Sequence, residues 1–340
     1  MYPLAYGFMD SETEDNWKWW MAQLHKVVGD LPKLAICSDA CKGLLNAVRD
    51  VFPEVDRREC FRHLMQNFVK RYSGDSSGHM WPAARAYDKH VYESHMAIVY
   101  AALSSAKSWL ETHHKLKWQR SDFDPDIKCD YVTSNVAEVF NNWIKDIKDL
   151  PVVELADKIR EMIMILSYKR RKIGERLYGR ILPAVIQILN ARTRGLGHLT
   201  VIKGDNYAAE VWDNFNRRFV VKAYLHECSC CEWQHTGKPC QHALSLITAR
   251  QIRNVRMEDF VHDYYSVEKF RKAYARQIEQ LPSKEKWPKV DLAFEVGAPL
   301  SKRGVGRQQK IGSKVALKVE VVGLNVLKSL LKMRMRRLKK

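Results

Sequence analysis

The first 72 residues alternate between helical and strand-like patterns of apolar positions. The Trp-rich run NWKWWMAQLHKVV repeats its apolar residues at helical spacing, and Ser11 with Glu14 forms a plausible capping box before it. The short apolar run LAIC, which ends at Ser38 and Asp39, is typical of an interior strand. The expected elements are a helix over about 13–28, a strand at 34–37, a helix over 43–52, a strand at 57–60 and a helix over 61–72. This alternation of strand, helix and strand predicts an α/β core.

Beyond a flexible, Gly- and Ser-containing break at 73–79, the pattern is mainly helical. We expect helical structure over 83–118, a helix that starts after Ser134 as its N-cap, and helices over about 152–175 and 178–192. The pattern then changes, because VWDNFNRRFVVKAYLHECSC reads as a β-hairpin with its turn at 214–217. Short helices over 244–250 and 267–280 and a linker over 282–299 complete the expected elements.

Charge and cysteine usage narrow the class of protein. Lys and Arg total 57 against 39 Asp and Glu, a formal charge of +18, which favours a polyanionic partner. Residues 301–340 contribute thirteen of these cations and only one acid, so we expect a solvated basic tail there. Only eight cysteines occur in 340 residues, and no apolar run reaches the roughly 18 residues of a membrane helix. We therefore expect an intracellular, soluble chain with reduced thiols and no membrane partner.

Half of the cysteines fall in one window, CSCCEWQHTGKPCQH, which covers residues 228–242. On a strand, Cys228 and Cys230 would point to the same side, and Gly237 and Pro239 provide a reversal that brings Cys240 and His242 back to them. Three thiolates and one imidazole form a closed tetrahedral shell, which is the pattern of a structural Zn²⁺ site without an open catalytic position.

Alternatives to this ligand set remain open at this stage. The cysteines could instead be ordinary buried residues of a small hairpin, whereas a redox role lacks a C-x-x-C motif. His226, Cys231 and His235 rank below the four as substitute ligands, and we expect Cys231 to be a bystander thiol.

The window CSCCEWQHTGKPCQHAL resembles the SWIM zinc finger found in plant Mutator-like transposases. The agreement covers the C-x-C and C-x-H spacing, the Trp before the turn, the T-G-x-P-C turn and the H-A that follows. SWIM modules bind nucleic acid in some proteins and other proteins elsewhere, so the finger alone does not define a function.

Independent residues agree with the same family. Mutator-like transposases resemble ribonuclease H in their core, where two Asp and one Glu hold two metal ions for DNA strand cleavage and transfer. By resemblance, Asp39 in SDACKGL matches the second Asp and Glu138 in SNVAEVFNN matches the Glu, with Cys60 and His63 as the intervening C-x-x-H. The alternatives are a helix N-cap for Asp39, a solvated helix face for Glu138, and a buried thiol with a packed His, or an accessory metal pair, for Cys60 and His63.

The resemblance implies an incomplete core, because the family's first catalytic Asp lies upstream of a segment like YPLAYG, which here begins at Tyr2. We therefore expect an N-terminally truncated transposase that holds Mg²⁺ or Mn²⁺ only if an intact core exists. Loss of the first strand would also expose an apolar sheet edge unless another element pairs there.

The resemblance, extended over about residues 1–295, gives an expected organisation. It comprises a partial ribonuclease H-like core with a helical insertion (1–150), a helical connector (151–205), a SWIM finger (206–252), a helix and linker (253–300) and the basic tail (301–340).

The leading hypothesis is a nuclear, zinc-binding derivative of a Mutator-like DNA transposase, inactive as this chain, whose partners are terminal inverted repeats and further copies of itself. The alternative is a domesticated, non-enzymatic transcription regulator similar to the far-red-response group.

Overall fold

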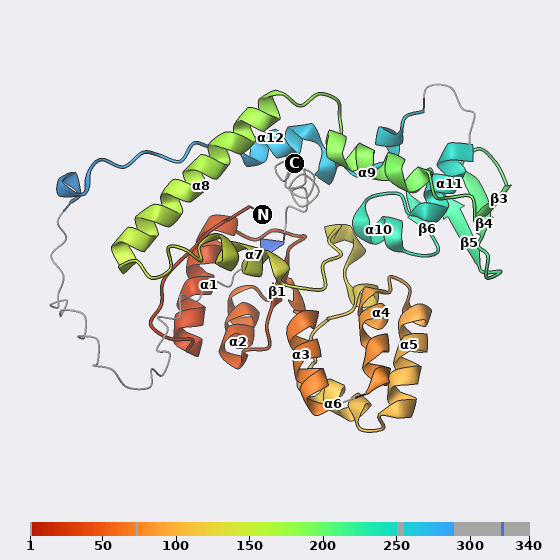
Figure 1. Cartoon of the computed structure of the whole chain (residues 1–340), viewed down its shortest axis with the longest axis horizontal. Helices are drawn as coiled ribbons and strands as arrows, with labels where there is room; N and C mark the ends of the chain where they lie inside the picture. The colour runs from red at the N-terminus through yellow and green to blue at the C-terminus, as the bar shows by residue number, and fades with distance from the viewer. Residues whose placement is uncertain (1, 73, 250–254, 289–320, 323–340) are drawn as a thin grey trace.

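The computed structural model describes residues 2–72, 74–249, 255–288 and 321–322, and it is a mixed α/β structure. Its N-terminal sheet contains β1 (Ala35–Ser38) and β2 (Asp56–Glu59), which run parallel and are connected by helix α2 (Lys42–Val51). Figure 1 shows this sheet near the middle of the molecule, with the helical and finger regions around it. The predicted strand, helix and strand order of this region is confirmed.

Helix α1 (Glu14–Val28) packs against α2 and buries its apolar face beside β1. The helices approach closely at Gly43, where a Cβ would come within 3.1 Å of Glu14 Cα. The predicted capping box of Ser11 and Glu14 is wrong, because Thr13 is the N-cap and its hydroxyl accepts the amide hydrogen of Asn16. The Ser11 carbonyl instead accepts a hydrogen bond from the Asn16 side chain, which holds the chain before the helix.

The next helices form a separate hydrophobic cluster that stands beside the sheet. They are α3 (Phe61–Arg71), α4 (Met80–Arg85), α5 (Lys89–Ala102) and α6 (Ala106–His113), joined by the 3₁₀ helix η1 (Asp75–His79) and followed by η2 (Arg120–Asp122). The next 3₁₀ helix, η3 (Pro125–Ile127), instead packs Ile127 with Ala35 of β1. Phe61 and Phe68 of α3 are completely buried in this cluster together with Met80. The region predicted as a flexible break therefore contains a 3₁₀ turn, η1.

Helices α7 (Asn135–Trp143), α8 (Val152–Glu175) and α9 (Pro183–Thr193) lead from the core towards the finger, as Figure 1 shows. The second connector helix begins five residues later than the 178–192 prediction, since Pro183 occupies its first turn. The later short elements are η4 (Met257–Phe260), η5 (Asp263–Tyr265), α12 (Val267–Ala273) and η6 (Lys284–Lys286).

Two arginines fasten the end of α8 to the end of α12. Arg171 donates from Nε to the Tyr274 carbonyl and from Nη2 to the Arg276 carbonyl, both at 3.0 Å. Arg271 donates in return to the carbonyls of Gly174 and Leu177, at 2.9 and 2.7 Å. Each guanidinium therefore donates to main-chain carbonyls at or just beyond the C-terminus of the other helix, where the helix dipole favours a cation.

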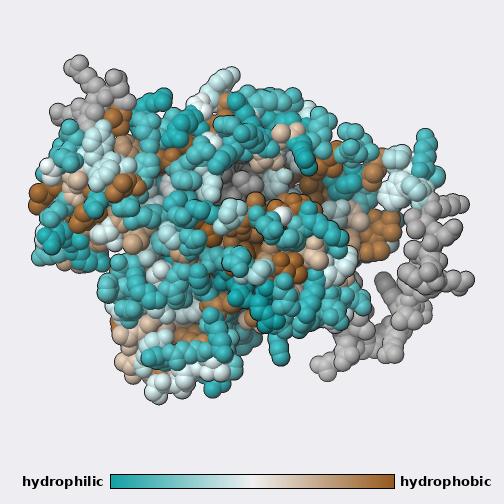
Figure 2. All heavy atoms as spheres, turned by 180° about the vertical axis from the view of Figure 1, so that it is seen from behind, coloured by the Kyte–Doolittle hydropathy of each residue, from teal (hydrophilic) through white to brown (hydrophobic). Residues whose placement is uncertain are grey.

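The finger contains a four-stranded antiparallel sheet of β3 (Thr200–Lys203), β4 (Ala208–Trp212), β5 (Arg218–Lys222) and β6 (Glu227–Cys228), with helices α10 (Glu232–Thr236) and α11 (Gln241–Ala249). The predicted hairpin is β4 and β5, whereas β3 was not predicted from the sequence. The inner face packs Val211 and Val221 against α11. The outer face leaves Ile202 and Val220 exposed, and Figure 2 shows apolar surface at this end of the molecule.

A third strand, β7 (Val321–Val322), pairs antiparallel with β1 on the side opposite β2. The sequence analysis expected an exposed sheet edge unless another element pairs with it. At Ala35 and Ile36 of β1, β7 is that element. The remainder of the predicted basic tail lies outside the described residues. Among the described helices, none combines the length and the apolar composition that a membrane crossing demands.

Candidate metal centre

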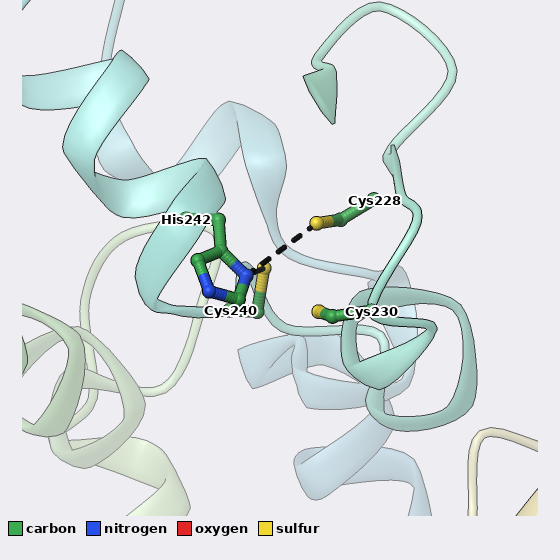
Figure 3. Close-up of side chains that lie close together, drawn as sticks. All are labelled: Cys228, Cys230, Cys240 and His242. Atoms are coloured by element: carbon green, nitrogen blue, oxygen red, sulfur yellow. Dashed lines mark hydrogen bonds between the residues drawn. The ribbon is translucent and has the colours of Figure 1, made fainter. Parts of the chain in front are cut away.

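Four side chains converge between the last strand of the finger and its last helix. The ligand atoms of Cys228, Cys230, Cys240 and His242 all lie within 4.8 Å of one another (Figure 3). Cys228 and Cys240 are fully buried, His242 is nearly so, and Cys230 is partly covered. The structure thus brings together the four residues that the spacing indicated.

The first pair reaches the site by a turn rather than by strand alternation. Cys228 ends β6, and the following residues form a tight turn in which the Cys231 amide donates to the Cys228 carbonyl at 2.9 Å. Ser229 fixes this turn to β5, since its amide donates to the Val220 carbonyl and its hydroxyl accepts the Val220 amide. The prediction that Cys230 lies on the strand is therefore wrong, although the turn still directs both thiols to the same place.

The second pair is placed by the N-terminus of α11. Cys240 directly precedes the helix, its thiol accepts the amide hydrogen of Ala243 at 3.4 Å, and its carbonyl accepts that of Leu244 at 2.8 Å. His242 lies in the first turn, with Nδ1 at 3.7 Å from the Cys228 sulfur and 3.9 Å from the Cys240 sulfur. The helix N-terminus favours negative charge, as a thiolate ligand requires.

Phe219 orients the imidazole of His242. The two rings are stacked with centroids 3.8 Å apart and an interplanar angle of 13°. This contact holds the ring so that Nδ1, rather than Nε2, faces the sulfurs. In a tetrahedral zinc site with Zn–S of about 2.3 Å and Zn–N of about 2.0 Å, sulfur and nitrogen ligands lie about 3.5 Å apart. The observed separations of 3.7 and 3.9 Å are slightly longer than this value.

The thiols themselves favour a cation. Hydrogen bonds from Cys228 and Cys230 lower the pKa of Cys240, whereas contact with Cys228 and Cys240 raises the pKa of Cys230. In such a buried group, one thiolate makes the ionisation of the next unfavourable. A divalent cation removes this conflict and permits three thiolates at neutral pH, so the donor set fits Zn²⁺.

The three residues ranked as substitute ligands lie outside this group. Cys231 caps α10 with φ of 61°, and its thiol contacts the Ser229 carbonyl. His226 stacks on Trp233 at 5.3 Å, and burial lowers its pKa. His235 is buried against Tyr87, and its pKa is lowered to about 4, mainly by burial, so the ring is neutral at pH 7.

Asp39, which matches a transposase carboxylate, lies at the carboxyl end of β1, and the start of the helix that carries Glu138 lies at the same edge. Asp39 directly follows β1, and the Cys60 amide donates to the Ser38 carbonyl at 2.7 Å. Cys60 is buried and its sulfur accepts the amide hydrogen of Ser134, the N-cap residue of α7, at 3.2 Å. The first turn of α7 is therefore held at the sheet edge that carries Asp39.

The structure also describes the surroundings of the other residues that the resemblance singled out. The N-cap residue of α2 is Cys41, two positions after Asp39. Glu138 lies on α7, but its side chain is outside the described residues. His63 is partly buried on α3, and Cys60 and His63 belong to no three-residue metal group among the residues that the structure describes.

Two residues of the finger were missed by sequence reasoning. Phe219 could have been found, because it lies in the predicted hairpin two positions before Val221, which pairs with Cys228. Gln234 accepts the Cys228 amide hydrogen at 3.2 Å and donates to the Cys228 carbonyl at 2.9 Å. No sequence signal distinguishes this glutamine, since its role depends on how α10 folds back.

Comparisons with known proteins agree with this geometry. Residues 1–67 match the family model of the MULE transposase domain, which includes Asp39, Cys60 and His63. Residues 211–251 match that of the SWIM zinc finger, which includes all four clustered residues. The two matches do not include residues 68–210, and therefore not Glu138. A search of curated proteins found no match. The chain thus carries a MULE transposase domain at its N-terminus and a SWIM zinc finger at 211–251.

Proposed function

We propose that this protein is a zinc-binding, DNA-binding member of the Mutator-like transposase group that acts in the nucleus. The observation that carries the proposal is the buried cluster of Cys228, Cys230, Cys240 and His242 in a chain whose N-terminus matches a transposase domain. Three sulfurs and one nitrogen complete a tetrahedral shell, so the Zn²⁺ would be structural. Bound zinc would join the turn after β6 to the N-terminus of α11.

The core supports a ribonuclease H-like assignment in its local arrangement. Asp39 follows a central parallel strand, and the start of α7, the helix that carries Glu138, is held beside it through Cys60. Carboxylates are the side chains that hold Mg²⁺ or Mn²⁺ in two-metal nucleases. The substrate class that follows is DNA with terminal inverted repeats, bound in part through the positive charge of the chain.

Zinc content tests the first part of the proposal. The purified wild-type chain should contain about one zinc ion per molecule, as a closed four-ligand site requires. Cys228→Ser should lose the metal, whereas Cys231→Ser, which changes a neighbouring thiol outside the cluster, should keep it. A wild-type preparation with well under one zinc per chain, or equal zinc in both variants, would refute the metal assignment.

DNA binding and cleavage test the second part. The chain should bind terminal-inverted-repeat DNA, with an affinity that decreases steeply as salt increases. Nicking that requires Mg²⁺ or Mn²⁺ and is lost in Asp39→Ala, but not in the exposed-site variant Asp126→Ala, would support a transposase. Binding without nicking would agree with both an inactive transposase derivative and the transcription-regulator alternative, and absence of binding would refute the DNA proposal.

A further inference from the structure

The finger is attached to the core through its shortest helix. Lys128 follows η3 in the core, where its backbone adopts the left-handed conformation with φ of 55°, and its Nζ donates to the Gln234 carbonyl of α10 at 2.9 Å. The two residues are 106 positions apart in the sequence. Lys128 also lies outside both family matches. The contact therefore joins the finger to a segment that neither family model includes.

Gln234 carries this contact to the metal cluster. Its side-chain amide is bonded to both main-chain polar groups of Cys228, while its own carbonyl accepts the Lys128 ammonium. With only five residues, α10 is too short to be stable alone, and its terminal carbonyls have few partners within the helix. The position of the Cys228 backbone thus depends on α10, and Lys128 is one of the contacts that hold α10 in place.

A second set of core contacts surrounds the other end of α10. Asp130 accepts hydrogen bonds from Tyr87 at 2.8 Å and pairs with Arg120 at 3.1 Å, and the nearby charge of Lys238 helps to keep it ionised. Lys238, two residues before the ligand Cys240, donates to the hydroxyl of Tyr265 at 3.2 Å. These contacts hold the turn that leads to the second ligand pair.

Tyr265 completes the attachment. Its hydroxyl donates to the Thr236 carbonyl at 2.7 Å, and the ring of Tyr87 lies against that of His235. The segment between the two ligand pairs is therefore held by residues outside the matched finger. The core and the segment after the finger therefore both help to position the residues between the two ligand pairs.

We propose that Lys128 is a positioning residue for the zinc centre. By fixing α10, and through Gln234 the backbone of Cys228, it slows the opening of the site and so retains the metal. The reverse also follows: loss of zinc releases α10, and with it the core segment 125–130. This inference rests on the zinc binding proposed above.

Zinc transfer from the full chain to a chromophoric chelator provides the test. Lys128→Met should release zinc about 10-fold faster than wild type, the lower end of the effect seen when groups behind a metal ligand are lost. Lys128→Arg, which can still donate to the Gln234 carbonyl, should restore slow release. Lys115→Met removes an exposed lysine of the core and should behave as wild type. Release from Lys128→Met that is no faster than from Lys115→Met would overturn the proposal.

Amide hydrogen exchange of the same proteins gives an independent readout. Removal of zinc from the wild-type chain should increase exchange in segment 125–130 as well as in the finger, while β1 and β2 stay protected. Increased exchange confined to residues 206–252 would overturn the coupling. Wild-type chain that holds no zinc would instead refute the metal assignment itself, so the two failures are distinguishable.

Discussion

Arg58 is a buried cation, and the contribution of its carboxylate partner Asp56 to stability can be tested directly. Its side chain is 1% exposed and stands over the Phe123 ring at 3.9 Å. Nε donates to Asp56 Oδ2 at 2.8 Å, Nη2 forms an ion-pair contact with the same oxygen at 2.7 Å, and Nη1 donates to the Cys129 carbonyl at 2.7 Å. Asp56 also pairs with Lys117 at 2.7 Å, but the lysine side chain is 46% exposed.

Replacement of Asp56 by Asn should therefore be costly. Lys117 can turn towards water when the carboxylate is lost, whereas Arg58 cannot, because its side chain is buried against the Phe123 ring. Removing one partner of a buried ion pair costs about 3–5 kcal/mol, since the remaining charge is left uncompensated. We expect the free energy of unfolding to fall by about 3 kcal/mol, because the Cys129 carbonyl and the Asn oxygen still accept hydrogen bonds.

Urea unfolding of the zinc-loaded chain measures this loss. The matched control is Asp126→Asn, because Asp126 pairs with Lys33 at an exposed site and should change stability by about 0–1 kcal/mol. If Asp56→Asn unfolds at the same urea concentration as this control, the reasoning about the buried charge is wrong.

The same pair gives a pH dependence. Burial alone would raise the pKa of Asp56, but the charges of Arg58 and Lys117 and their hydrogen bonds outweigh it, so the pKa in the folded state is lowered. The stabilisation is then complete above the unfolded pKa of about 3.9 and disappears as the pH falls through the lower folded value. The difference between wild type and Asp56→Asn should accordingly shrink below about pH 4.

Two further substitutions test backbone and helix-end contacts by urea unfolding. Gly237→Ala should destabilise the zinc-loaded chain by about 1–3 kcal/mol, because Gly237 has φ of 66° and a Cβ would lie 2.7 Å from His262 Cβ. Gly195 has open space around it, so Gly195→Ala should leave stability unchanged. Equal destabilisation by both substitutions would contradict the strain argument. Arg171→Met should lower the free energy of unfolding by about 1–3 kcal/mol, because it removes two hydrogen bonds to the carbonyls that follow α12. The exposed Lys172→Met should lose at most about 0.5 kcal/mol, and a similar loss in both would show that the contact is unimportant.

Secondary structure and ligand residues could be predicted from the sequence where they depend on residues close together along the chain. The order of β1, α2, β2 and α3 followed from local periodicity, and the clustered cysteines followed from their spacing. The N-cap of α1 was misplaced by two residues, because Ser11 and Thr13 have equivalent capping chemistry and only the Asn16 contacts distinguish them.

Contacts between distant segments could not be predicted. The sequence of a C-x-C motif does not show whether it forms a strand or a turn. Cys230 lies in a turn because Ser229 forms hydrogen bonds with β5. Strand β3 is short and mostly exposed, so its sequence carries little alternation. The contact of Lys128 with Gln234 spans 106 residues and depends on tertiary structure alone.

The reciprocal arginine contacts between α8 and α12 change how the charge of this protein should be counted. Arg171 and Arg271 belong to the formal +18, yet their guanidinium groups are directed at main-chain carbonyls of the protein itself. The slope of DNA affinity against salt reports only the cations that neutralise phosphates. In an alanine scan of basic residues, Arg171→Ala and Arg271→Ala would weaken DNA binding by disturbing the fold. Such a scan would therefore wrongly assign a DNA contact to a surface that joins two helices.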